Sequence, residues 1–258
     1  MGSIRTFALI SICAAALLLF SYPVAAEQVR SEVQHTAVID ENYSDVTLSI
    51  GLRELSQIKL EATEFLRGVV IQINAPRAML QFRESFLLSI YSNPSPLPRD
   101  GVRSYSAVKL LSKPFPSAPR TFIDLPFREQ SGWDKSALNS IIVADRPQTQ
   151  DYPLLLTIDP IMKGIPSDVA RSRFEITIRP VLENEGALLV ELPDDTDREA
   201  LELLVDGEVQ PKTSGRLILP TGVHQVAVNS DQYLPYSTSV GIEQAQTTRL
   251  EVQLEPAQ

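Results

Sequence analysis

The sequence predicts a mainly β protein, built as two β-sandwich-like domains with one or two short helices in the first. Apolar and polar residues alternate with a period of two in many short runs, which is the pattern of half-buried strands. Turn signals such as Asp206-Gly207 separate the runs, and Asp-Gly favours a tight hairpin because glycine accepts positive φ. A shift in charge near residue 184 indicates a boundary between the two domains.

The first 26 residues are typical of a secretory signal peptide. Arg5 is the only charged residue there, an apolar run covers residues 7–20, and small residues precede a cleavage site expected after Ala26. The run is short for a membrane anchor, and lipidation of Cys13 is disfavoured because Ile12 before it is not small. Cys13 is the only cysteine, so the mature chain would depend on burial and backbone pairing rather than on disulfides.

The charge is unevenly distributed. The full chain carries a formal charge of −9, and removal of the leader gives −10. Residues 185–258 contain 13 acidic and 4 basic side chains, whereas residues 27–184 contain 19 and 18. Such an acidic half should repel nucleic acid and anionic lipid surfaces, so we expect no nucleic-acid partner; the acidic surface is first of all a source of solubility.

Residues 27–183 are predicted to form a β-rich N-terminal domain. Alternating or dense apolar runs at this spacing indicate strands of an antiparallel sandwich, and they occur at residues 46–50, 58–60, 69–73, 86–91, 121–125, 154–158 and 174–178.

Two features interrupt these runs. Residues 76–84 begin with Pro76 and contain good helix formers, which predicts a short helix, and residues 133–138 suit another helical turn. Between Asn93 and Pro119 proline is dense, which is poorly tolerated in central strands. We therefore expect long loops around an edge strand at residues 105–111, either as connectors or as binding loops.

Residues 184–258 are predicted to form a second, smaller domain. Leu188, Val190 and Leu192 share one face of a strand, and Val226 and Val228 share another with His224. Pro220 and Gly222 mark a turn before that strand. About six strands follow one another in some 70 residues, which indicates a compact sandwich.

The stretch from residue 184 to 254 resembles the PEGA domain, a small β-sandwich module of bacterial cell-envelope proteins. That family runs Gly-x-Leu-x-Val, a Pro-containing turn, a strand ending in Asp-Gly, then Pro-x-Gly-x-His-x-Val-x-Val and an aromatic. The tetrapeptide that names the family is not intact here, and Gln232 replaces the glycine before Tyr233. No catalytic residues define the family, so the resemblance implies none. The matching positions are Gly186, Leu188, Val190, Pro193, Leu203, Val205, Asp206, Gly207, Pro220, Gly222, His224, Val226, Val228 and Tyr233.

One local signal conflicts with this resemblance. Thr196 and Glu199 have the spacing of a capping box, and helix-favouring residues follow. Because the family requires a strand by about Leu203, we expect a loop or a single helical turn at residues 196–200, followed by a strand.

The sequence offers no constellation that specifies a reaction, so no catalytic, cofactor-binding or metal-binding residue is predicted. His224 is expected to be a core or rim histidine bonded near the turn, and His35 has no obvious partner. A carboxylate pair such as Asp151 and Asp159 is left open, although aspartates at strand ends usually form turns. The acids Asp194, Asp195 and Asp197 lack the glycine and distal glutamate of an EF-hand loop and are expected to be a solvated turn.

These observations predict a non-catalytic exported protein of the bacterial cell envelope, periplasmic or envelope-associated. Its expected role is that of a structural or protein-interaction module that docks an envelope protein or the cell-wall polymer, without a cofactor. A glycan-binding protein is the alternative, because sugar sites need exposed aromatic platforms, and a hydrolase is a weaker one. The candidate platforms are Tyr105, Trp133, Tyr152, Tyr233 and Tyr236.

Overall fold

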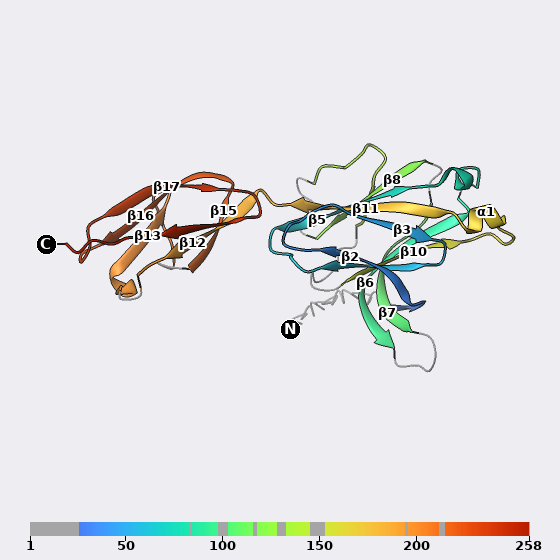
Figure 1. Ribbon diagram of the computed structural model, residues 1–258, viewed down its shortest axis with the longest axis horizontal. Coiled ribbons are helices and arrows are strands. Elements are labelled where there is room, and N and C mark those ends of the chain that lie inside the picture. The colour runs from blue at the N-terminus through green and yellow to red at the C-terminus, as the bar shows by residue number, and fades with distance from the viewer. Residues whose placement is uncertain are drawn as a thin grey trace, which may run out of the picture.

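The computed structural model describes residues 26–82, 84–97, 103–115, 118–127, 133–144, 153–193, 196–211 and 215–257. In this part of the chain nearly all regular structure is β-strand, so the predicted mainly β class is confirmed. Figure 1 shows two strand-built bodies joined end to end, each made of two sheets. We call residues 26–182 the N-terminal sandwich and residues 185–257 the C-terminal module. The signal peptide and Cys13 lie outside the described residues, which begin at Ala26.

The N-terminal sandwich consists of a six-stranded sheet, β1-β7-β6-β10-β4-β2, and a five-stranded sheet, β3-β11-β5-β8-β9. The runs expected to be strands are all found in strands. The bounds are β1 (Ala26–Arg30), β2 (Val33–Ile39), β3 (Val46–Gly51), β4 (Leu55–Leu60), β5 (Leu66–Asn74), β6 (Phe86–Leu97), β7 (Ser104–Pro114), β8 (Arg120–Pro126), β9 (Ile141–Ile142), β10 (Leu154–Pro160) and β11 (Arg173–Leu182).

The main core lies between these two sheets. Phe174, Ile176 and Ile178 point inward from β11, and Leu154 and Leu156 point inward from β10; all five are at most 1% exposed. Alternation produces this arrangement because every second side chain of a strand lies on the same face. The polar residues between those of β11 consequently lie on the outer face of its sheet.

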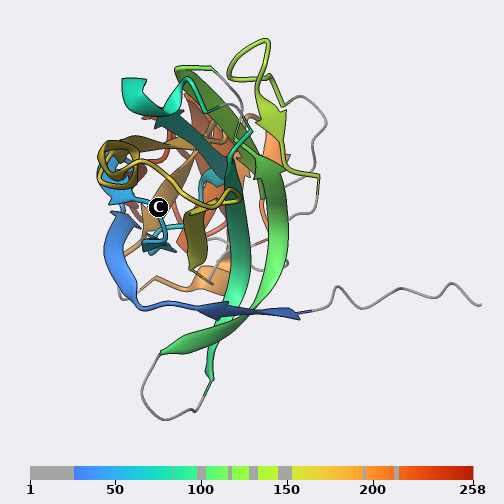
Figure 2. The ribbon, with the colours of Figure 1, turned by 90° about the vertical axis from the view of Figure 1, so that its right-hand side faces the viewer.

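A smaller apolar cluster lies on the outer face of the six-stranded sheet. Leu155 and Tyr91 are buried there, with Val29 of β1 beside them. Figure 2 shows the β6–β7 hairpin, in green, reaching past the body of the sandwich, with β1, in blue, crossing it. The first strand is thus the edge strand next to β7, and its Val29 side chain contributes to the outer cluster.

The expectation of an edge strand at residues 105–111 is wrong. β7 contains these residues, and it lies between β1 and β6 rather than at an edge. Pro94 and Pro96 fall within β6, where the register shifts between Ser92 and Ser95. That irregularity lets a strand contain prolines, since the ladder is already interrupted there.

The expectation of a purely antiparallel sandwich is wrong, because two of its strand pairs are parallel. β2 pairs with β4 in parallel, as does β8 with β9. The β2–β4 pair is parallel because β3, which lies between them in the chain, belongs to the opposite sheet. The chain therefore returns to the first sheet running in the same direction.

Helical structure in the N-terminal sandwich is short. The helix expected from Pro76 is a single 3₁₀ turn, η1 (Arg77–Met79), and the chain also forms one turn of α-helix, α1 (Ser167–Ala170). The helical turn expected at residues 133–138 is absent: this segment forms bends and a turn.

The C-terminal module packs the sheet β15-β12-β18 against the sheet β14-β13-β16-β17. β12 pairs with β18 in parallel, and the other pairs in the module are antiparallel. The bounds are β12 (Glu185–Glu191), β13 (Leu201–Val205), β14 (Glu208–Val209), β15 (Gly215–Pro220), β16 (Gly222–Ser230), β17 (Tyr236–Ile242) and β18 (Thr247–Glu251).

Two local predictions for this module are confirmed: the hairpin at Asp206-Gly207 and the single helical turn before the strand at Leu203. Asp206 and Gly207 form a two-residue hairpin turn with φ of 51° and 83°, in which Val205 pairs with Glu208. Gly222 has a positive φ of 142°. Residues 196–205 contain one 3₁₀ turn, η2 (Arg198–Ala200), followed directly by β13.

The two bodies meet at a short junction, because only residues 183 and 184 separate β11 from β12. Arg216 of the C-terminal module forms an ion pair with Glu64 at 2.5 Å, and its guanidinium lies 5.7 Å from the ring centroid of Phe65. The Gln244 amide donates to the carbonyl of Glu183 at 2.9 Å. Arg216 therefore contacts the N-terminal sandwich directly, and Gln244 ties the C-terminal module to the connecting residue Glu183.

Candidate functional site

One hollow lies at the end of the N-terminal sandwich remote from the C-terminal module, near α1 (Figure 1). We call it the distal hollow. Two loops form it: the β3–β4 turn and the segment between β10 and α1. Its volume is about 430 Å³, and its lining residues are Leu52, Arg53, Pro160, Met162, Lys163, Gly164, Ile165 and Ala170.

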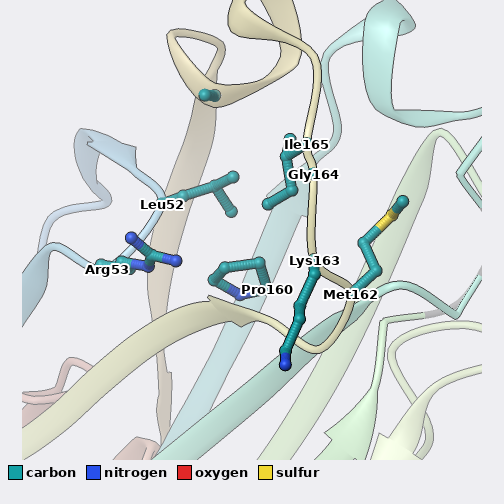
Figure 3. A pocket seen from close by; sticks show the side chains of 8 residues that line it. Leu52, Arg53, Pro160, Met162, Lys163, Gly164 and Ile165 are labelled. Carbon is teal, nitrogen blue, oxygen red and sulfur yellow. The ribbon is translucent and has the colours of Figure 1, made fainter.

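The floor of the distal hollow is apolar and its rim is cationic. Leu52 and Ile165 pack against the main core, so the floor is continuous with the interior of the sandwich. Figure 3 shows Arg53 and Lys163 on either side of Pro160. An apolar surface flanked by two positive charges suits a ligand that combines an apolar group with an anion.

The β3–β4 turn is held by a polar cluster beneath the hollow. Glu54 accepts hydrogen bonds from Nη1 and Nη2 of Arg173 at 2.9 and 2.8 Å and from the backbone N–H of Gly51 at 2.8 Å. His35 Nε2 lies 2.7 Å from the same carboxylate. Arg173 also donates to the hydroxyl and the carbonyl of Ser49, at 3.0 and 2.6 Å. The cluster thus joins strands of both sheets.

Electrostatics in this cluster keep Glu54 ionised. Burial raises the pKa of the Glu54 carboxyl, but the hydrogen bonds from Arg173, Gly51 and His35 together outweigh it and lower the pKa to about 2. His35, for which the sequence suggested no partner, is therefore part of an ion-paired group. Glu54 is fully engaged and does not neutralise its neighbour Arg53.

In the C-terminal module, His224 connects two turns. It is 9% exposed, its Nδ1 lies 2.7 Å from Asp206 Oδ2, and its Nε2 lies 2.8 Å from the carbonyl oxygen of Pro220. The hydrogen bond to Asp206 raises the pKa of His224, and the one to Pro220 acts in the same direction. With both ring nitrogens engaged, His224 has the structural role expected from the sequence.

The aromatic side chains considered as sugar platforms are half-buried wherever the structure describes them. Gly68 leaves room for the Trp133 ring, since a Cβ on Gly68 would lie 2.6 Å from it, and Arg67 lies 5.6 Å from the centroid of that ring. Tyr233 and Tyr236 pack against the core of the C-terminal module and Tyr105 against the outer cluster. Tyr152 lies outside the described residues.

Of the carboxylates considered for chemistry, the structure describes Asp159 and Asp197. Asp159 accepts a hydrogen bond from Thr157 at 3.0 Å, and Asp197 accepts one from the N–H of Glu199 at 3.1 Å. Asp151, Asp194 and Asp195 lie outside the described residues. Within the described ranges, no three His, Cys, Asp or Glu side chains are grouped so as to hold a metal ion. No helix of that same part is long and apolar enough to cross a membrane.

Comparison with known families supports the resemblance of the C-terminal module: residues 195–258 match the PEGA domain. The match begins after β12, although β12 is the central strand of its sheet, between β15 and β18. The folded module therefore extends about ten residues before the matched range. The rest of the chain matches no family.

No curated protein matches this chain. Among solved structures, one described as "Crystal structure of group B streptococcus pilus 2b backbone protein" aligns with 89% of this chain and 97% of its own, at 10% identity and a TM-score of 0.23. A similarity this weak carries no argument about fold or function.

Proposed function

We propose that this protein is an exported, non-catalytic component of the bacterial cell envelope that acts as a structural or protein-interaction module. In this proposal residues 27–183 and 184–258 are two domains, the second a PEGA-type domain, and the leader is removed after Ala26. Such cleavage would leave residues 27–30 of β1 in place, paired with residues 104–107 of β7.

The observation that carries the proposal is the braced junction next to the PEGA match. A two-residue connection fixed by Arg216, Glu64 and Gln244 suits a protein that holds two binding surfaces at a set separation. A flexible linker would instead let the two surfaces move independently. Each described aromatic candidate packs part of its ring against other residues, so the glycan-binding role remains the second proposal and the hydrolase the third.

Two measurements test this proposal. Mass spectrometry of the tagged chain from fractionated cells should find an N-terminus at Glu27 in the envelope fraction, and an intact Met1 in the cytosol would contradict export. Affinity capture from solubilised envelopes should recover a defined protein that rebinds the purified chain. Recovery of no partner from any fraction would count against an interaction role.

A further inference from the structure

We propose that the distal hollow is a docking site for an apolar peptide that carries a free C-terminal carboxylate. This inference rests on the interaction role proposed above, and it names the chemistry of the partner. The hollow of about 430 Å³ falls within the ~300–1,000 Å³ typical of sites for small ligands, which is enough for the last few residues of a chain.

The two cations on the rim are available to a ligand. Arg53 and Lys163 are both exposed, and neither side chain has a hydrogen bond or ion pair to another residue in the part of the chain that the structure describes. The acid next to Arg53 in the sequence, Glu54, is bound by Arg173 instead. Charge complementarity therefore favours an anionic partner at this end of the molecule.

The backbone at Arg53 supports a role beyond folding. Arg53 has a φ of 65°, in the left-handed region that favours glycine. The Glu54 cluster and a hydrogen bond from the Arg53 N–H to the carbonyl of Ile158, at 2.9 Å, hold the turn in this conformation. A strained non-glycine residue at a pocket rim is a recurring feature of binding sites. Here the turn holds the Cα atom of a cationic residue, Arg53, at the rim of the hollow.

The shape of the hollow favours a peptide over a long acyl chain. None of its eight lining residues is buried, and Arg53, Lys163, Gly164 and Ala170 are exposed. A shallow, open hollow of this kind would leave most of an extended hydrocarbon chain exposed to water, so that the chain would gain little free energy from binding. A peptide end needs only a short apolar contact together with pairing of its carboxylate.

The test is calorimetric titration of the full mature chain with N-acetyl-Leu-Leu, with the same peptide as its C-terminal amide, and with octanoate. We expect the free acid to bind, with an affinity that falls as salt is added, and the amide to bind more weakly. Arg53→Gly and Lys163→Gln should each reduce the affinity about fivefold, the upper range for an exposed ion pair. Lys59→Gln, which removes an exposed lysine of β4 outside the hollow, is the matched control and should bind as the wild type does.

Folding and binding can be separated at Arg53. Glycine relieves the left-handed backbone, so Arg53→Gly should unfold at an equal or higher urea concentration than the wild type while it loses affinity. No binding of the free acid at millimolar concentration, equal binding of acid and amide, or unchanged binding by both rim variants would overturn the site. Tighter binding of octanoate than of the peptide would overturn the choice of a peptide. If both rim variants still captured the envelope partner, the distal hollow would be excluded and the interaction role would stand.

Discussion

The cluster around Glu54 allows a quantitative test of what holds the N-terminal sandwich together. Replacing Glu54 with Gln keeps the size of the side chain but removes its charge. The pKa of Glu54 is lowered from an ordinary 4.5 to about 2, which corresponds to roughly 3 kcal/mol at about 1.36 kcal/mol per pKa unit. The Glu54 side chain is 27% exposed, so solvent screening reduces this figure, and we expect a loss of about 2 kcal/mol in the free energy of unfolding.

The chain offers a specific probe for this measurement. Trp133 is the only tryptophan and packs over Gly68 in the N-terminal sandwich, so its fluorescence during urea unfolding reports on this body alone. Glu61→Gln, at an exposed residue of the same body, is the control and should change the stability by less than about 0.5 kcal/mol.

The stabilisation by ionised Glu54 should depend on pH. Because the folded-state pKa of Glu54 is lowered, its contribution is present above about pH 4.5 and is lost as the pH falls towards 2. The difference in stability between the wild type and Glu54→Gln should shrink over that interval. A difference below about 0.5 kcal/mol at pH 7, or one independent of pH between 4.5 and 2, would refute this account of the cluster.

Three further predictions concern the C-terminal module, each measured by thermal or urea unfolding followed by circular dichroism. Gly222→Val should lower the free energy of unfolding by about 1–3 kcal/mol, because a branched side chain is strained at a φ of 142° although no atom blocks it. An unchanged unfolding midpoint would show that the backbone of the turn relaxes without strain. Gly186→Ala should be more damaging, since its Cβ would collide with the backbone oxygen of Glu243, whereas Gly241→Ala has open space and serves as its control; equal effects of the two would contradict the packing. His224→Phe should lower the free energy of unfolding by about 2 kcal/mol, because it leaves the hydrogen-bond partners of His224 unpaired. The difference in stability from the wild type should narrow as the pH rises through the raised pKa of His224, because the charged form of the ring provides the added stability.

The sequence predicted those elements whose signals are local. Strand β11 was predictable because its apolar residues alternate, and the hairpin at Asp206 because aspartate and glycine both tolerate positive φ. The strand after residue 200 was predictable only because the PEGA resemblance outweighed a capping-box signal. The helical signal there produces only the single 3₁₀ turn η2, which directly precedes β13.

The contacts that build the candidate site were not predictable from local signals. His35, Glu54 and Arg173 are brought together across separations of 19 and 119 residues, and nothing near any one of them indicates the others. The exposed Arg53 resembles any surface arginine until its backbone conformation is known. The edge strand expected at residues 105–111 was wrong for a similar reason. Flanking prolines predict an edge, but they do not show that β1 and β6 pair with β7 on its two sides.

The most direct test of the central claim is cross-linking in living cells, followed by mass spectrometry of the cross-linked peptides from the tagged full chain. If the proposed function holds, the chain begins at Glu27 and is cross-linked in the envelope fraction to a distinct protein, through residues of either body. A chain that keeps Met1, remains in the cytosol and forms no cross-link to another protein would contradict it.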